Sequence, residues 1–117
     1  MKRNKFNFNH CFVVPTVGKS PYLEGCLYSL KKQKIKSKII ITTAKPFDGL
    51  KKIARKYNIK LIIFNKHKNI ANDWNRAINS SKSNYVTIAH QDDIYSKDYL
   101  YEIVKSLKKI NKNKPSI

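Results

Sequence analysis

Four short apolar segments divide the chain and predict the strands of one sheet. Each segment is continuous rather than alternating and is rich in β-branched or aromatic residues, which is typical of a strand buried on both faces. The segments are Cys11–Val14, Ile39–Thr42, Leu61–Phe64 and Tyr85–Ala89. Strands of this kind belong to parallel sheets whose two faces are covered by helices.

Apolar residues between and after these segments recur with helical spacing, which predicts helices that each bury one face. The apolar stripes are Leu23, Cys26, Leu27 and Leu30; Leu50, Ile53, Ala54 and Tyr57; and Leu100, Ile103, Val104 and Leu107. A further helix is expected over 70–79, capped by Asn69. We expect Ser20 to cap the first helix and Ser96 the last, and Asn58 to end the second in a left-handed conformation.

This alternation of strands and helices predicts a three-layer α/β/α fold with a mainly parallel sheet. The chain has 117 residues, of which 41% are hydrophobic. That length suits one domain with a core of its own, since domains have ~100 to 200 residues. We therefore expect residues 1–117 to form one domain, with a basic tail, Lys108–Ile117, that frays.

Several classes of protein do not fit the sequence. No segment approaches the ~20 apolar residues that span a bilayer, and the basic N-terminus is not followed by the apolar region of a signal peptide. The chain lacks GxxxxGK[ST], GxGxxG and HExxH motifs. Cys11 and Cys26 lie in apolar patterns without CxxC spacing. We expect both to be buried, reduced thiols in a cytoplasmic protein.

The charge is strongly positive, because 25 basic and 7 acidic residues give a net charge of +18. Such a chain attracts polyanions, and nucleic acid, an anionic membrane and a nucleotide diphosphate all qualify. The codon bias of an AT-rich genome, which adds solvated lysines to the surface, is the alternative explanation of this excess. Two basic runs also suggest peripheral contact with the inner face of a membrane. They are Lys31, Lys32, Lys34, Lys36 and Lys38; and Lys105, Lys108, Lys109, Lys112 and Lys114.

The residues that follow the strands are the candidates for a site, because ligands of open parallel sheets bind at the carboxyl ends of the strands. Thr16, Thr43, Asn65, Asp92 and Asp93 occupy these places, and we expect them to meet at one edge. The adjacent Asp92 and Asp93 repel each other, so Mg²⁺ or Mn²⁺ would stabilise the pair. The alternative is a turn or a helix cap at these two positions. The histidine before the pair, His90, is expected to be structural.

Four sequence motifs resemble those of family 2 glycosyltransferases, in the same order and over about residues 10–110. The first strand ends in a Pro-Thr pair, the first helix reads Tyr-Leu and Cys-Leu-x-Ser-Leu, and a later strand leads to an Asp-containing motif. The matching segments are Phe12–Thr16; Tyr22–Leu30 with Gln33; Asn69–Ala71 with Trp74–Ile78; and Asn84–Asp93.

The resemblance implies the donor-binding half of a GT-A fold. Asp93 would hold a divalent ion on the diphosphate of a nucleotide-diphosphate sugar, and Asp92 would contact the ribose or a metal-bound water. The ion acts as a Lewis acid on the leaving diphosphate. The substrate-binding residues would be Pro15, Thr16, Thr43, Asn65, Asn75 and Asp92.

The sequence also departs from the family pattern. Gln91 stands where many members have an acid, Thr43 and Ala44 where many have an Asp that reads the base, and Trp74 where an Arg is common. The identity of the base is therefore open. Family catalytic domains are longer, and the acceptor half that carries the usual catalytic base is missing. We therefore expect a truncated or short member and assign no catalytic residue.

Three functions stay open at this level. The first is the donor-binding region of an inverting glycosyltransferase, and the second is a module that binds a nucleotide or nucleotide sugar without catalysis. The third is a basic α/β protein that binds nucleic acid, which is disfavoured because no recognised motif for it is present. Nucleic-acid binding would weaken steeply with salt, whereas donor binding would require Mn²⁺ or Mg²⁺.

Overall fold

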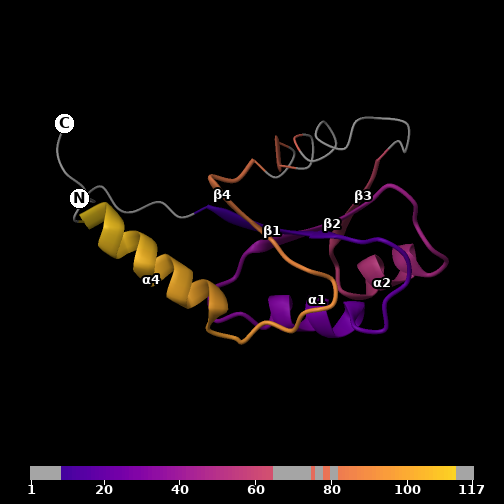
Figure 1. Cartoon of the computed structure of the whole chain (residues 1–117), viewed down its shortest axis with the longest axis horizontal. Coiled ribbons are helices and arrows are strands. Elements are labelled where there is room, and N and C mark those ends of the chain that lie inside the picture. Colours follow the sequence, from indigo (N-terminus) through magenta and orange to yellow (C-terminus); the bar gives the residue numbers. More distant parts are fainter. Residues whose placement is uncertain (1–8, 65–74, 76–77, 80–81, 113–117) are drawn as a thin grey trace.

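The structure, a computed structural model, describes residues 9–64, 75, 78–79 and 82–112 (Figure 1). Its elements are β1 (His10–Pro15), α1 (Leu23–Lys31), β2 (Lys38–Thr43), α2 (Leu50–Lys56), β3 (Lys60–Ile63), β4 (Tyr85–Ile88) and α4 (Tyr99–Lys112). The described residues of the helix expected over 70–79, Asn75, Ile78 and Asn79, are helical. The cap expected at Asn69 lies outside the described residues.

The four strands form one parallel sheet in the order β3-β2-β1-β4. Phe12 of β1 pairs with Ile39 of β2 on one side and with Thr87 of β4 on the other. The predicted parallel α/β fold is therefore confirmed. Because all strands run the same way, their carboxyl ends share one edge of the sheet and their amino ends share the opposite edge.

Each face of the sheet has its own apolar cluster, as the continuous strand patterns predicted. On one face, Phe12, Val14 and Ile41 pack with apolar residues of α1, α2 and α4, and Figure 1 shows α1 and α2 on the same side of the sheet. On the other face, Val13 and Ile40 pack with neighbouring strand residues. β1 is thus buried on both sides and is the central support of the fold.

Two of the helices begin later than predicted. α1 begins at Leu23, and the Ser20 hydroxyl oxygen still accepts from the backbone N–H of Tyr22 at 3.1 Å, as expected of a cap. The same hydroxyl donates to Asp92 Oδ1 at 2.6 Å. α4 begins at Tyr99, whose backbone N–H donates to the carbonyl of Ser96, rather than directly after Ser96. The left-handed Asn58, with φ of 54°, is confirmed. α4 continues to Lys112, into the segment that we expected to fray.

Both cysteines are buried and free, as predicted. Burial raises the pKa of the Cys11 thiol to about 11. Burial also raises the pKa of Cys26 to about 11, and the nearby carboxylates of Asp93 and Asp92 add to the shift. Neither thiol is therefore a reactive thiolate at neutral pH. No described helix is long and apolar enough to cross a membrane.

Gln33 ties the end of α1 to the start of α4, and its side chain is 1% exposed. Its Nε2 donates to the carbonyl of Ser96 at 2.6 Å, and its Oε1 accepts from the backbone N–H of Leu100 at 2.8 Å. This connection fixes the loop that leads from the acidic pair into α4.

Replacing Gln33 with alanine should lower the free energy of unfolding by about 3 kcal/mol, because the buried Leu100 N–H and the part-buried Ser96 carbonyl lose their partners. Urea denaturation measures the change. Lys52→Ala, at an exposed position of α2, is the control and should change stability by less than about 0.5 kcal/mol. A Gln33→Ala variant as stable as that control would contradict the structural role.

Candidate functional site at the carboxyl edge of the sheet

Thr16 and Thr43 join the carboxyl ends of β1 and β2. The backbone N–H of Thr16 donates to the carbonyl of Thr42 at 2.8 Å, and the Thr43 hydroxyl donates to the carbonyl of Thr16 at 3.2 Å. Each threonine is 4% exposed. Their hydroxyls therefore hold the two strand ends together and fix the loops that follow.

These loops enclose a pocket of about 420 Å³. Its walls come from the β1–α1 and β2–α2 connections, namely Thr16, Val17, Gly18, Ala44, Lys45, Pro46 and Phe47. Gly18 has φ of +70°, a conformation that L side chains rarely adopt. The pocket offers an aromatic ring, a lysine and backbone groups, and its size suits a small-molecule ligand.

The acidic pair follows β4 and is fastened to the same loop. The side-chain amide of Gln91 accepts from the backbone N–H of Val17 at 3.2 Å and donates to the Val17 carbonyl at 3.3 Å. Asp92 accepts from Ser20, three residues before α1. Val17 thus belongs both to the pocket wall and to the support of Asp92 and Asp93.

The loop beyond the pair is held against α1. The backbone N–H of Asp93 donates to the His90 carbonyl at 3.1 Å and closes a turn. Ile94 packs on α1 at Gly25, where a Cβ would lie 2.9 Å from Ile94 Cδ1. The backbone N–H of Tyr95 donates to the Ser29 hydroxyl at 3.0 Å. The turn at Asp93 therefore rests on a supported backbone.

The two carboxylates differ in what they are free to bind. Asp92 and Asp93 are both exposed, but Asp92 already accepts the Ser20 hydrogen bond. Within the described part of the chain, the Asp93 carboxylate has no hydrogen-bond or ion-pair partner. No group of three or more His, Cys, Asp and Glu side chains gathers among the described residues. Two carboxylates suit Mg²⁺ or Mn²⁺, which usually keep waters and bind substrate phosphates.

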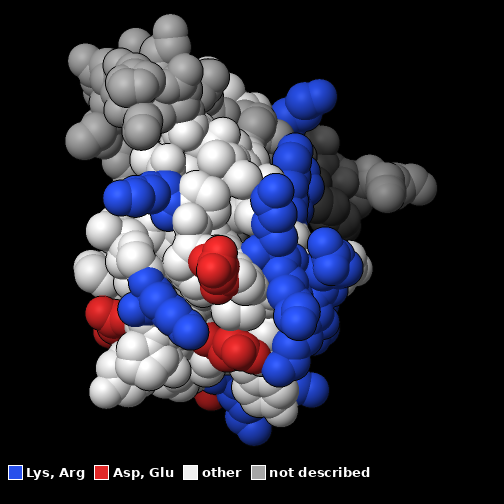
Figure 2. Space-filling view, turned by 90° about the vertical axis from the view of Figure 1, so that its right-hand side faces the viewer, with Lys and Arg blue, Asp and Glu red and all other residues white. Residues whose placement is uncertain are grey.

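Positive charge surrounds this edge. Figure 2 views the side toward which β1 runs in Figure 1, and it shows a band of lysine and arginine side chains beside separate carboxylates. Lys45 lies in the pocket wall itself. A negatively charged ligand is therefore attracted to this side.

The structure brings most of the predicted site residues together. Thr16, Thr43 and Asp92 are joined through the contacts above, and Pro15 ends β1 beside Thr42. Thr43 lies under the pocket rather than in its wall, since Thr16 lines the pocket and Thr43 does not.

The structure does not test the predicted places of Asn75 and Asn65 at the site. Asn75 is helical and exposed, and its place at the site stays a prediction. Asn65 lies outside the described residues. The sequence did not indicate Lys45 and Phe47, although their loop directly follows a predicted strand, and it did not indicate the bond from Ser20 to Asp92.

Comparison with known protein families agrees with this geometry. The model of the glycosyl transferase family 2 matches residues 11–115, nearly the whole chain. No curated protein sequence gives a significant match.

Solved structures share the fold at low sequence identity. TarS from S. aureus has a TM-score of 0.74 and 20% identity over 88% of this chain and 20% of its own. The mannosyltransferase PcManGT from Pyrobaculum calidifontis, in complex with GDP-Man and Mn²⁺, has a TM-score of 0.75 and 20% identity over 87% of this chain and 33% of its own. A cytidylyltransferase from Leptospira borgpetersenii has a TM-score of 0.63 and 13% identity over 84% and 47%. This chain spans less than half of each of these structures.

Proposed function

The chain belongs to glycosyltransferase family 2, and we propose from this premise that its carboxyl-edge site binds the nucleotide-diphosphate sugar donor of a sugar transfer. One observation carries the proposal. Val17 is at once a wall of the 420 Å³ pocket and the partner of Gln91, so the acidic pair sits beside the pocket. A nucleoside in the pocket would place its diphosphate near Asp92 and Asp93.

Each residue of the site has a role in this proposal. Phe47 and Val17 offer apolar surface to the nucleoside, and Lys45 offers a positive charge. Pro15, Thr16 and Thr43 shape the pocket through the strand ends. Asp92, oriented by Ser20, faces the ribose or a metal-bound water. Asn65 and Asn75 stay proposed substrate contacts on family grounds.

The acidic pair fits a divalent ion, and Asp93 is the proposed ligand because its carboxylate is exposed and unpaired among the described residues. A bound Mn²⁺ or Mg²⁺ would supply Lewis-acid stabilisation of the leaving diphosphate. The complex of PcManGT with GDP-Man and Mn²⁺ supports this choice of cofactor. The chain's own contribution is to hold both carboxylates on a backbone that Gln91 and Ile94 brace.

Isothermal titration calorimetry with UDP, GDP, CDP and ADP tests the proposal. At least one nucleotide should bind at least about tenfold more tightly with Mn²⁺ than with EDTA, since the ion neutralises the diphosphate beside two carboxylates. Nucleotide binding that is indifferent to the metal would contradict the proposal. Metal-independent binding of single-stranded DNA that weakens steeply with salt would favour the nucleic-acid alternative. Release of sugar from the bound donor would indicate an enzyme, whereas donor binding without release would indicate a binding module.

Contact with an anionic membrane at the cytoplasmic face is a second proposal, and the two basic runs favour it. Lys34 of the first run and Lys105 of the second lie over the same Tyr101 ring, at 5.0 and 5.9 Å from its centroid. Lys34 and Lys105 therefore bring the two runs together at this ring. A lysine near anionic lipid is worth ~1 kcal/mol. The Lys32→Gln, Lys36→Gln double variant should bind to phosphatidylglycerol vesicles about 30-fold more weakly than wild type in a sedimentation assay. Equal partitioning of wild type onto neutral and anionic vesicles would contradict the contact.

A further inference from the structure

A second hollow lies at the amino-terminal edge of the sheet, opposite the donor site. The pairing of β2 with β3 begins at Ile40 and Lys60, so the first residues of β2 run past the start of β3. The step leaves a hollow of about 410 Å³, bounded by Lys31 at the end of α1 and by Asn58 before β3. We call this hollow the amino-edge notch.

The notch is basic and has no acidic residue in its walls. Three of its eight lining residues are lysines, Lys31, Lys38 and Lys60, and none is a carboxylate. Within the described part of the chain, Lys31 and Lys60 take part in no ion pair, whereas Lys34 and Lys56 each pair with an acid. The charges of Lys31 and Lys60 are therefore not neutralised by an acid among the described residues.

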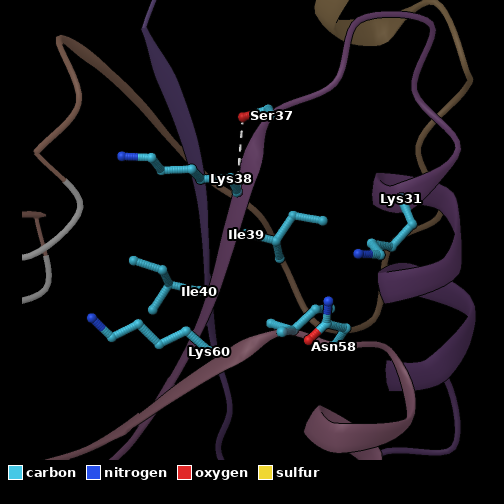
Figure 3. Close-up of a pocket in the computed structure, with 8 residues that line it drawn as sticks. Lys31, Ser37, Lys38, Ile39, Ile40, Asn58 and Lys60 are labelled. Carbon is cyan, nitrogen blue, oxygen red and sulfur yellow. Dashed lines mark hydrogen bonds between the residues drawn. The ribbon is translucent and has the colours of Figure 1, made fainter.

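Two polar side chains converge on the α1 side of the notch. Figure 3 shows the Lys31 ammonium group and the Asn58 amide pointing toward one another, while Lys38 and Lys60 extend on the other side of the strands. Asn58 holds its position because it ends α2 with φ of 54°. An anion between Lys31 and Asn58 would meet two donors, and the other lysines would raise the local potential.

Apolar walls strengthen these interactions. Ile39 and Ile59 line the notch and are 9% and 8% exposed. Charges interact more strongly beside such a low-dielectric wall than in open water. The carbonyl groups at the end of α1 would oppose an anion, but the Lys36 ammonium donates to the Lys31 carbonyl at 3.1 Å. That contact covers the opposing group and adds a further positive charge.

We propose that the amino-edge notch binds a phosphate monoester group, at a site separate from the donor site. A phosphate monoester carries about −1.5 to −2 charges at pH 7 and three acceptor oxygens. It suits an ammonium group and an amide in a positive potential better than a singly charged carboxylate does. A soluble phosphate ester and the headgroup of phosphatidic acid carry this same group.

Inorganic phosphate, titrated into the full chain at constant ionic strength, tests the site. In ¹H–¹⁵N spectra the amide signals of Lys31, Asn58 and Lys60 should shift together. Lys31→Gln should weaken phosphate binding about tenfold and Asn58→Gly, which tolerates the positive φ, about threefold. Lys51→Gln, at an exposed lysine of α2 outside the notch, and Asp93→Asn should change it less than about twofold.

Equal weakening by Lys31→Gln and Lys51→Gln would overturn the site, because general charge attraction would then explain the binding. Signal shifts spread evenly over the lysines would overturn it as well.

Vesicles with and without phosphatidic acid identify the source of the phosphate group. Binding to them that Lys31→Gln weakens tenfold assigns the lipid headgroup. Phosphate binding that such vesicles do not displace assigns a soluble ester. Since Asp93→Asn affects only the donor site, failure of one proposal leaves the other testable.

Discussion

Asp93→Asn should remove the Mn²⁺ dependence of nucleotide-diphosphate binding. It should also weaken that binding by about tenfold to 100-fold. Loss of residues that only orient metal ligands already costs this much in metal affinity, and Asp93 is the exposed carboxylate with no partner among the described residues. Asparagine keeps the shape of the side chain, so the turn closed by the Asp93 N–H and the His90 carbonyl should persist. Calorimetry with and without Mn²⁺ measures the effect.

Glu102→Gln is the matched control for this variant. It removes the same charge from α4, where Glu102 lies 3.9 Å from Lys105, and it should leave the metal dependence unchanged. Ser20→Ala should have an intermediate effect, because it frees the Asp92 oxygen and loosens the orientation of that carboxylate. Identical weakening by Asp93→Asn and Glu102→Gln would mean that overall charge, rather than a metal site, governs the binding.

The hydrophobic pattern predicted the elements of the described sheet because burial on both faces leaves a strong local signal. The run Cys11–Val14 lies inside β1, and Ile39–Thr42 lies inside β2. The helical stripes likewise coincide with the buried faces of α1 and α2, which include Leu27 and Leu50. These features depend on residues close together in the sequence, so the sequence alone was sufficient.

Contacts between distant residues account for what the sequence did not predict. Ser20 accepts from the nearby Tyr22 N–H, as its local context predicts, but its hydroxyl also donates to Asp92, which lies 72 positions away in the chain. Gln33 fits the helix motif by its position, yet its role comes from Ser96 and Leu100. Local patterns carry no record of such partners.

The same difference between local and long-range signals decides which residues of the candidate site were predicted. The rule that the ends of parallel strands meet at one edge predicted that Thr16, Thr43 and Asp92 lie together. Lys45 and Phe47 lie in a loop without periodicity, so nothing in the sequence indicated that their loop forms a pocket wall. The fastening of Gln91 to Val17 was also hidden, because the motif marked Gln91 only as a departure from an acid.

His10 is a polar residue that the fold buries, and it should make stability depend on pH. It opens β1 and is 5% exposed. Its Nδ1 lies 2.8 Å from the Ser37 hydroxyl oxygen and its Nε2 lies 2.7 Å from that of Thr87. Ser37 donates its own proton to a backbone carbonyl. Nδ1–H therefore donates to Ser37, and Nε2 accepts from Thr87.

This environment favours the neutral ring, because burial lowers the pKa of His10 from 6.5 to about 4. In the unfolded chain the imidazole takes up a proton as the pH falls below 6.5, whereas in the folded chain it does so only near pH 4. The unfolded state therefore binds more protons between these values, and stability decreases as the pH falls. One pKa unit corresponds to ~1.4 kcal/mol, so the loss between pH 7 and pH 5 should be about 2 kcal/mol.

Urea denaturation at pH 7, 6 and 5 measures this loss. The range stops at pH 5 because the pKa of Glu24 is lowered by its hydrogen bond from Lys56, and the stability from that carboxylate is lost only below its ordinary value of 4.5. His10→Gln retains a donor and an acceptor but does not titrate. It should be less stable than wild type at pH 7, because its amide fits the ring's place poorly, and should lose the dependence on pH. A wild-type stability that is level from pH 7 to pH 5, or an unchanged slope in His10→Gln, would show that the buried ring is not the group that titrates.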